Sequence, residues 1–374
     1  MKFTVSSTEL LDGLVSVSKV ISTKPGLAIL ENFLLELHGN TLSITASDGE
    51  STLRTQLEIA HVEEEGRTAV PAKLLTDSLK EFPDQPLTFI IGPGEPVMDI
   101  IWSSGASKIP CYNAADFPKT AAVSADAESL TLSADTLLEG IGDTLYATAE
   151  EELRPVMNGI FFDLDEASST LVASDAHKLI CAEFTGAAVS RKSSFILHKK
   201  PAAILRGSLA KYEGDVNIRF DAKNAFFSFG QTILVCRLIE GIYPAYRTVI
   251  PRNNNNRMII GRTELLNVAK RIAVCSNQVS NQIKIRFSEG QATLSAQDLS
   301  FSTSAFETVP CQYEGEEMEV GFKASYLLEI LNNLHYRNIC MQLADPTRAA
   351  LIVSADEDSP EVNVKAVIMP VMVN

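Results

Sequence analysis

The sequence predicts an α+β protein of three tandem, similar domains, because three features recur along its 374 residues. A stretch from Phe3 to Ile21 returns from Leu130 to Thr148 and from Met258 to Ser276, with a Leu-Leu pair at the same place in each copy. Two strand-like segments follow each copy, and a proline closes each third of the chain. Recurrence over such a length indicates duplicated domains, since short structural repeats have periods of roughly 20 to 50 residues.

Each copy of this stretch begins with residues that alternate like a strand and then changes to helical spacing. Ser6 and Glu9 fit a capping box at this change, and Ser133 and Gly261 are acceptable N-caps in the other copies. We therefore expect a strand followed directly by an amphipathic helix at the start of each domain.

A hairpin and a second helix are predicted in each domain. His38-Gly39-Asn40 is a turn signal between two strand-like runs. The predicted strand pairs are Asn32 to Leu37 with Thr41 to Ser47, Gly159 to Asp165 with Thr170 to Ser174, and Ile283 to Phe287 with Ala292 to Ala296. The predicted second helices are Pro71 to Phe82, Lys199 to Leu209 and Lys323 to Leu334. Each domain is thus expected to pack two helices on antiparallel sheets.

The joins between the domains are predicted from composition. Residues Lys119 to Glu128 are rich in Ala and Ser, and Arg252 to Arg257 contains four consecutive Asn, so both are expected to be exposed linkers. We place the domains at 1–122, 123–252 and 253–374. Because no atypical capping repeat is visible, units that stack edge to edge are expected to close into a ring.

Charge and cysteine content exclude several classes of protein. The formal net charge of −15 argues against a protein that coats nucleic acid, which needs an excess of Lys and Arg. The six cysteines stand singly, without the spacing of a zinc or redox site, and we expect them to be reduced. No apolar run reaches the roughly 18 residues of a membrane span, and the N-terminus lacks a signal-peptide pattern. We expect a cytoplasmic protein without a cofactor, a metal or a membrane partner.

Four motifs carry a family resemblance that spans the whole chain. They are Met-Lys-Phe-Thr-Val at the start, Ala-Ala-Asp-Phe-Pro at 114–118, Tyr-Pro-Ala-Tyr-Arg at 243–247 and Met-Pro at 369–370. With these motifs and its three homologous thirds, the chain resembles the DNA polymerase III beta subunit, the bacterial sliding clamp. The resemblance implies the DNA clamp fold and a head-to-tail homodimer, in which six domains form a ring with helices lining the hole. It implies a protein that is not an enzyme, encircles duplex DNA without sequence specificity and tethers the replicative polymerase for processive synthesis.

A ring that holds DNA topologically needs only weak attraction to phosphates. Lys73 and Lys80 are seven residues apart and share one face of a predicted helix. The resemblance adds basic loops around Lys24 and Arg154. The candidates for contact with double-stranded DNA are Lys24, Lys73, Lys80, Arg154, Lys199, Lys200, Arg206, Lys270 and Arg271. The residue pattern alone leaves open that these are ordinary solvated helix faces.

The resemblance also implies a cleft between the second and third domains for a short, largely apolar peptide motif. The implied partners are the replicative polymerase, the clamp loader, and repair and translesion polymerases that carry such motifs. The matching positions are Met157, Ser174, Ala176, His177, Lys178, Leu179, Pro244, Thr248, Val249, Thr347, Ala349, Val367, Met369, Pro370 and Val371. The family usually has Gly at position 176 and Arg at positions 178 and 248. The residue pattern leaves open that Leu179, Val249 and Val367 are simply core.

Two other classes of function remain as alternatives. Asp175 and His177 could suggest a catalytic pair, but Asp48 and Asp298 stand at equivalent strand ends without a His, so turn capping explains the Asp better. A protein scaffold ring that does not touch DNA is the other alternative. For the contact between subunits, the resemblance points to the strand near Ile109 and to the helix end near Val274 and Cys275.

Overall fold

The computed structural model describes residues 1–24, 26–92, 96–150, 153–185, 189, 192–356 and 361–373. Within these residues the chain forms six α-helices and 26 β-strands. It divides into two compact units: unit 1 is Met1–Ala134 with Ala203–Leu238, and unit 2 is Asp135–Ala202 with Ile239–Asn374. The division falls inside helix α4 (Lys199–Leu209), so the middle third of the chain contributes to both units.

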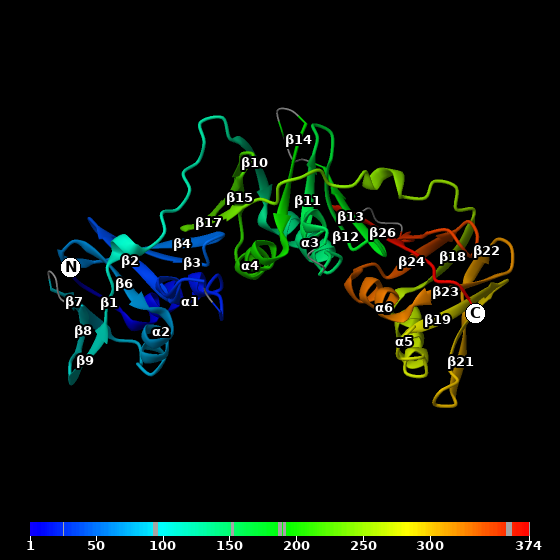
Figure 1. Cartoon of the computed structure of the whole chain (residues 1–374), viewed down its shortest axis with the longest axis horizontal. Helices are drawn as coiled ribbons and strands as arrows, with labels where there is room; N and C mark the ends of the chain where they lie inside the picture. Colours follow the sequence, from blue (N-terminus) through cyan, green and yellow to red (C-terminus); the bar gives the residue numbers. More distant parts are fainter. Residues whose placement is uncertain are drawn as a thin grey trace. The chain divides into compact units, whose positions relative to one another are not determined.

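Unit 1 contains two antiparallel sheets (Figure 1). The five-stranded sheet has the order β5 (His61–Glu64), β1 (Lys2–Ser6), β7 (Pro86–Ile91), β8 (Val97–Trp102), β9 (Gly105–Pro110). The eight-stranded sheet has the order β10 (Glu128–Ser133), β15 (Asp215–Phe220), β16 (Asn224–Phe229), β17 (Thr232–Arg237), β4 (Ser51–Glu58), β3 (Thr41–Ser47), β2 (Asn32–His38), β6 (Gly66–Pro71). Pairing of β17 with β4 therefore joins segments almost 180 residues apart into one sheet.

Unit 2 contains the other two sheets. The nine-stranded sheet has the order β14 (Ser193–His198), β11 (Gly159–Leu164), β12 (Ser169–Ser174), β13 (Lys178–Phe184), β26 (Val362–Ile368), β25 (Ala350–Ser354), β24 (Asn338–Leu343), β18 (Asn256–Gly261), β22 (Gln312–Glu314). The four-stranded sheet has the order β21 (Thr303–Pro310), β20 (Gln291–Asp298), β19 (Gln282–Ser288), β23 (Met318–Lys323). Here β13 pairs with β26, which again joins distant segments.

The helices pack on these sheets through apolar stripes. Helix α1 (Ser7–Ser18) lies beside α2 (Ala72–Lys80), and α5 (Arg262–Ala273) lies beside α6 (Ala324–Asn333), as Figure 1 shows. The remaining long helix, α3, spans Ala134–Leu145. Leu10, Leu14 and Val17 of α1 are fully buried, at the spacing that places them on one helix face. None of the helices in the described part of the chain is long and apolar enough to cross a membrane.

The predicted strand-to-helix openings are confirmed in all three thirds, as β1–α1, β10–α3 and β18–α5. Ser6 caps α1, because its Oγ accepts hydrogen bonds from the backbone N–H groups of Thr8 (3.2 Å) and Glu9 (3.3 Å). The three hairpins and three second helices also form, with bounds that differ from the predictions by at most two residues. Four short 3₁₀ helices complete the chain: η1 (Ala28–Glu31), η2 (Ala114–Asp116), η3 (Pro155–Met157) and η4 (Tyr246–Thr248).

The prediction of two exposed linkers is confirmed for one and wrong in part for the other. Most residues of 119–128 are exposed. In the Asn-rich segment, however, Asn256 is buried, and its Nδ2 donates to the carbonyl oxygens of Leu343 (3.3 Å) and Ala344 (3.1 Å). Nδ2 of Asn254 donates to the carbonyl oxygen of Gln342 (2.8 Å). Two of the four Asn are therefore bound to the end of β24 rather than to solvent.

Candidate functional site

A cleft of about 250 Å³ lies in unit 2, and ten of the fifteen predicted peptide-binding residues line it. The lining residues are Arg154, Met157, Ser174, Ala176, His177, Lys178, Leu179, Tyr243, Pro244, Tyr246, Val249, Val367 and Met369. They come from η3, the β12–β13 turn, the end of β26 and residues 243–249, a segment that we call the strap. Most of the lining is apolar, with polar groups from a few residues, as in sites that take a large side chain of a ligand.

Strand pairing brings the two inner walls of the cleft together. Leu179 of β13 lies opposite Val367 of β26, and the backbone N–H of Met369 donates to the carbonyl oxygen of His177 (2.9 Å). Leu179 and Val367 are almost fully buried and belong to a core cluster that also contains Tyr243 and Tyr246. Leu179 and Val367 are therefore core residues, as one interpretation of the sequence had it, and they also form the floor of the cleft.

Five predicted residues do not line the cleft: Thr248, Thr347, Ala349, Pro370 and Val371. Thr248 is exposed and its Oγ1 donates to the carbonyl oxygen of Ala245 (2.7 Å). Thr347 is held by the carboxylate of Asp345. The chain after Met369 turns to β23, where Val371 pairs with Gly321. Of the five, Ala349 packs against the core cluster that contains Leu179 and Val367.

Sequence reasoning missed Tyr243 and Tyr246, which are the aromatic part of the lining. Tyr243 stacks on Phe161 of β11 with ring centroids 4.8 Å apart, and Tyr246 meets the same ring edge-on at 6.2 Å. The available signal is the Tyr-Pro-Ala-Tyr-Arg motif at 243–247. A Tyr pair three residues apart beside a proline indicates a fixed aromatic surface, because aromatic side chains bury large areas with few rotatable bonds.

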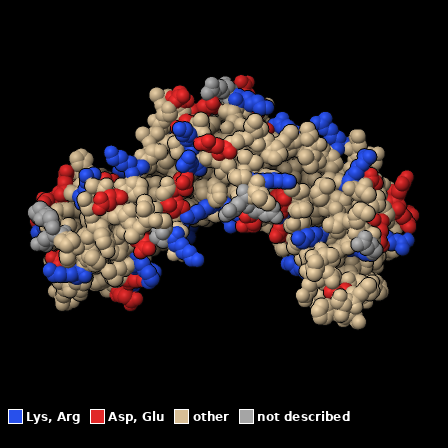
Figure 2. Space-filling model, viewed as in Figure 1, with Lys and Arg blue, Asp and Glu red and all other residues tan. Residues whose placement is uncertain are grey.

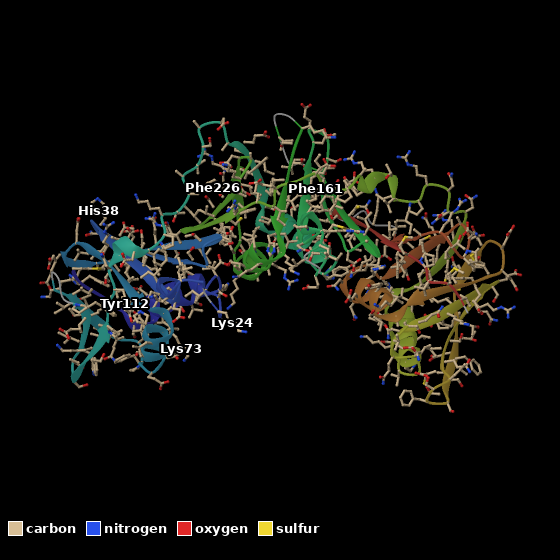
Figure 3. All side chains as sticks on the ribbon, in the orientation of Figure 1. Lys24, His38, Lys73, Tyr112, Phe161 and Phe226 are labelled. Atoms are coloured by element: carbon tan, nitrogen blue, oxygen red, sulfur yellow. The ribbon has the colours of Figure 1, made fainter. Side chains whose placement is uncertain are left out.

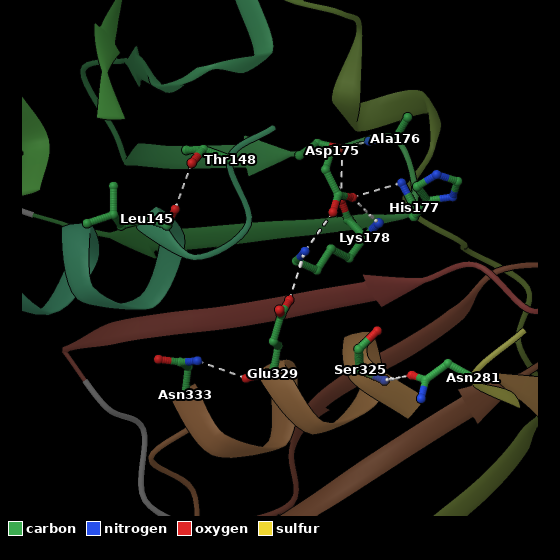
Figure 4. A network of polar contacts seen from close by, with 11 residues as sticks. Leu145, Thr148, Asp175, Ala176, His177, Lys178, Asn281, Ser325, Glu329 and Asn333 are labelled. Carbon is green, nitrogen blue, oxygen red and sulfur yellow. Dashed lines mark hydrogen bonds and ion pairs between the residues drawn. The ribbon is translucent and has the colours of Figure 1, made fainter. Parts of the chain in front are cut away.

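Lys178 is a buried residue that pairs with two carboxylates (Figure 4). Its Nζ lies 2.6 Å from Oδ2 of Asp175 and 3.0 Å from Oε2 of Glu329 on α6, and 4.7 Å from the centre of the Tyr326 ring. Burial lowers the pKa of Lys178, but the hydrogen bonds to these two carboxylates outweigh it and leave the pKa above its usual value. The β12–β13 turn is thus tied to α6 by charge.

The carboxylate of Asp175 also caps this turn, as the repeat predicted. Its Oδ1 accepts hydrogen bonds from the backbone N–H groups of His177 and Lys178, both at 2.9 Å. Asp48 does the same for Ser51 (2.7 Å), and Asp298 for Ser300 (2.8 Å). An Asp with this role at all three equivalent positions needs no catalytic explanation.

Ala176 holds a backbone conformation that favours glycine. Ala176 has a φ of 76°, in the left-handed region that favours glycine, and Gly49 has a φ of 96° in the equivalent turn of the first domain. The two equivalent turns therefore share a left-handed residue after the Asp, although this chain has a side chain at position 176.

The predicted DNA-contacting residues of unit 1 lie on its helices or on a loop beside them. Figure 3 shows Lys24 and Lys73 there, Lys24 on the loop after α1 and Lys73 on α2. Lys73 and Lys80 both pair with Asp77, with the Lys80 Nζ 3.3 Å from Oδ1, which confirms that they share a helix face. One carboxylate thus offsets part of the charge of two lysines.

The remaining predicted cations divide into three groups. Lys199 pairs with Glu150 (2.7 Å), and Arg271 makes a two-pronged contact with Glu307 of β21, with Nε at 2.8 Å. Arg154 lines the cleft. Arg206 and Lys270 are exposed on α4 and α5, and Lys200 is half-buried. Figure 2 shows the same mixture, with Lys and Arg interspersed among Asp and Glu over the visible surface.

Lys19, directly after α1, is a further cation of unit 1 that sequence reasoning missed. Its Nζ donates to the carbonyl oxygen of Gly207 (2.9 Å) in the last turn of α4, where the helix dipole favours a positive charge. Burial and the nearby charge of Lys211 lower the pKa of Lys19. A Lys directly after the last turn of a predicted helix was the available signal.

A second polar cluster in unit 2 surrounds Asp143 of α3. Asp143 is 2% exposed, and its carboxylate accepts no hydrogen bond from the described residues. Burial, with repulsion from Glu139, raises the pKa of Asp143 to about 7. Nε2 of the exposed His335 lies 3.6 Å from the Asp143 Oδ1. The described residues contain no group of three or more His, Cys, Asp or Glu that could hold a metal ion.

Comparison with known proteins places these features in one family. Residues 1–121, 131–245 and 247–372 match the N-terminal, central and C-terminal domains of the DNA polymerase III beta subunit. The beta sliding clamp of Proteus mirabilis is 30% identical over 348 residues, which cover 92% of this chain and 94% of that protein. The crystal structure of the DNA polymerase III subunit beta from Pseudomonas aeruginosa matches with a TM-score of 0.95 at 26% identity, and a structure of the clamp from that organism bound to griselimycin matches with a TM-score of 0.93 at 26% identity; each covers 100% of both chains. The chain therefore belongs to the DNA polymerase III beta subunit family, the sliding clamps of DNA replication.

Proposed function

We propose that this protein is a ring-shaped DNA sliding clamp that encircles duplex DNA and tethers the replicative polymerase through the cleft of unit 2. The observation that carries the proposal is similarity over the full length of known beta sliding clamps, in all three domains. We propose domain boundaries at 1–122, 123–252 and 253–374. The protein acts without catalysis, a cofactor or a metal, and works in the cytoplasm.

The cleft suits a short peptide with one or two large apolar side chains. Its floor is apolar and almost fully buried, because Leu179, Val367 and Tyr243 belong to the core, whereas His177 is exposed. Such a site binds by burying an anchor side chain, and its polar edge orients the backbone. We propose the ten lining residues that match the family as the direct contacts, with Thr248, Thr347, Ala349, Pro370 and Val371 around them. The occupants are the motifs of the replicative polymerase, the clamp loader, and repair and translesion polymerases.

The charges suit a protein that slides on DNA rather than grips it. Among the nine proposed DNA-contacting residues, Lys73, Lys80, Lys199 and Arg271 are paired with carboxylates. Such pairing weakens each phosphate contact, and DNA is then retained by enclosure and not by affinity. Arg154 is proposed to act at the mouth of the cleft and contact DNA only secondarily, because it lines the cleft.

A head-to-tail homodimer would close the ring by joining two free sheet edges. Strand β9 ends the five-stranded sheet of unit 1, and β21 ends the four-stranded sheet of unit 2. Phe306 of β21 is 80% exposed and Val274, beyond the end of α5, is 85% exposed. Ile109 of β9 is itself buried, so the backbone of this strand and not that side chain would make the contact. Edge pairing flanked by exposed apolar groups is a common route to association.

The experiment loads the labelled protein with a clamp loader onto nicked circular DNA and then cuts the circle. A clamp stays on the intact circle and is lost on cutting, whereas a protein scaffold that ignores DNA would not respond to the cut. Phe306→Asp should reduce the native mass from about twice 40.7 kDa to one chain and abolish retention. Val123→Asp, which places the same charge in the exposed linker, should do neither.

A further inference from the structure

The outer wall of the cleft has little backbone support of its own. The strap contributes Tyr243, Pro244, Tyr246 and Val249 to the lining, yet only η4 within it is regular structure. Among the described residues, the backbone–backbone hydrogen bonds of the strap run within the strap, such as Val249 N–H to the Tyr246 carbonyl oxygen (3.0 Å). Its position over the sheet therefore depends on side chains.

Two side chains of β11 hold the strap from below. Phe161 and Asp163 are two residues apart and face the same side of the strand. Phe161 stacks on Tyr243 and meets Tyr246 edge-on. Oδ2 of Asp163 accepts hydrogen bonds from the Tyr246 hydroxyl (2.7 Å) and from Nη2 of Arg247 (2.9 Å). The ring contacts of Phe161 are apolar and have no hydrogen-bond geometry. The hydrogen bonds to Asp163 therefore fix the orientation of Tyr246 and Arg247.

Arg247 closes this contact into a triangle. Its Nε donates to the Tyr246 hydroxyl oxygen at 3.0 Å while its Nη2 donates to Asp163. The Asp163 side chain is 8% exposed and the Arg247 side chain is 56% exposed. The carboxylate is therefore shielded from solvent, and the guanidinium group of Arg247 lies on its solvent side. Burial raises the pKa of Tyr246 to about 12, so the phenol stays a proton donor at neutral pH. Charge-assisted bonds of this kind are about twice as strong as neutral ones.

We propose that Asp163 is a positioning residue for partner binding, which holds Tyr246 and Arg247 so that the strap forms a preset outer wall of the cleft. This inference rests on the proposed function of the cleft. Asp163 is not among the residues that line the cleft, so its role would not be direct contact with the peptide. Its effect is on the cost of ordering: with the triangle intact the wall is formed before the peptide arrives, and without it the peptide must order the strap on binding.

The test uses the full-length protein and a fluorescein-labelled ten-residue peptide that carries the clamp-binding motif of the cognate replicative polymerase. Asp163→Asn and Tyr246→Phe each break the triangle, and Tyr246→Phe keeps the aromatic ring in the lining. Glu183→Gln is the matched control, because Glu183 pairs with Lys365 (2.9 Å) between strands of the same sheet and does not line the cleft. Affinity is measured by fluorescence anisotropy, with native mass and melting temperature for every variant.

Both triangle variants should raise the Kd about tenfold, and Glu183→Gln should change it less than about twofold. The double variant should lose no more affinity than the single variant with the larger loss, because both substitutions break the same hydrogen-bonded triangle. A tenfold loss in Glu183→Gln, or wild-type affinity in Tyr246→Phe, would overturn the inference. If Asp163→Asn does not fold, Tyr246→Phe alone decides. If the wild type fails to bind the peptide, the proposed function itself fails, which is a separate outcome.

Discussion

Replacing Asp143 by Asn removes a buried carboxylate that the fold stabilises mainly in its protonated form. The pKa of this group rises from 3.8 in the unfolded chain to about 7 in the folded protein, because burial disfavours the charge. Between these two values the unfolded chain releases the proton while the folded protein keeps it. Stability must therefore fall as the pH rises from about 4 to 7, and then stay low.

The size of this effect follows from the difference in pKa. A shift of about 3 units corresponds to about 4 kcal/mol above pH 7, at about 1.4 kcal/mol for each unit. The asparagine amide would itself be buried without a hydrogen-bond partner, which costs about 1 to 3 kcal/mol and cancels part of the gain. We therefore expect the free energy of unfolding to gain about 2 kcal/mol from Asp143→Asn at pH 8, and much less at pH 5. For a unit of this size, about 2 kcal/mol raises the melting temperature by roughly 4 to 8 °C.

The assay is differential scanning fluorimetry of the wild type and Asp143→Asn in steps from pH 5 to 8. The quantity compared is the difference in melting temperature at each pH, which cancels groups that titrate equally in both proteins. Asp77→Asn is the control, since Asp77 is exposed and paired with lysines, and its difference from wild type should not widen above pH 6. Parallel curves for wild type and Asp143→Asn over this range would refute the reasoning.

Three further predictions address the turn, the buried ion pair and the paired lysines. Ala176→Gly should raise the free energy of unfolding by about 0.5 to 1 kcal/mol, because glycine adopts the left-handed backbone without strain; a lower melting temperature would contradict this. Glu329→Gln should cost about 1 kcal/mol, because Lys178 is buried and keeps one carboxylate; an unchanged melting temperature would contradict it. Asp77→Asn should strengthen direct DNA binding about twofold to fivefold at low salt, with no difference at high salt, as measured by electrophoretic mobility shift.

The elements that could be predicted from sequence are those specified by local pattern. Helix α4 was placed with its observed bounds, because the apolar spacing of its residues begins directly after a strand ending at His198. The Asp residues at 48, 175 and 298 could be predicted as turn caps, because the same turn recurs in each third of the chain with the same residue at its start. Ser6 likewise caps α1 through its own neighbours. In each case the physical cause lies within a few residues.

The features that escaped prediction depend on groups far apart in the chain. Asn256 looks like linker composition, but its amide bonds to the end of β24, 87 residues later. The pairing of Lys178 could not be predicted, because Glu329 lies on α6, 151 residues further on. Tyr246 lines the cleft, and its hydroxyl group donates a hydrogen bond to Asp163 on β11, 83 residues earlier. A composition or motif argument cannot reveal such partners, since nothing near each residue marks them.

The shared sheet of unit 1 has a consequence for anyone who wishes to cut the protein into its repeats. Strand β4 meets β17 along an unbroken ladder, from Thr55 opposite Thr232 to Ser51 opposite Cys236. A fragment that stops at residue 122 would display that row of amides and carbonyls to solvent, and would recruit a second fragment or precipitate. Isolated repeats of this chain are therefore poor experimental substitutes for the intact polypeptide.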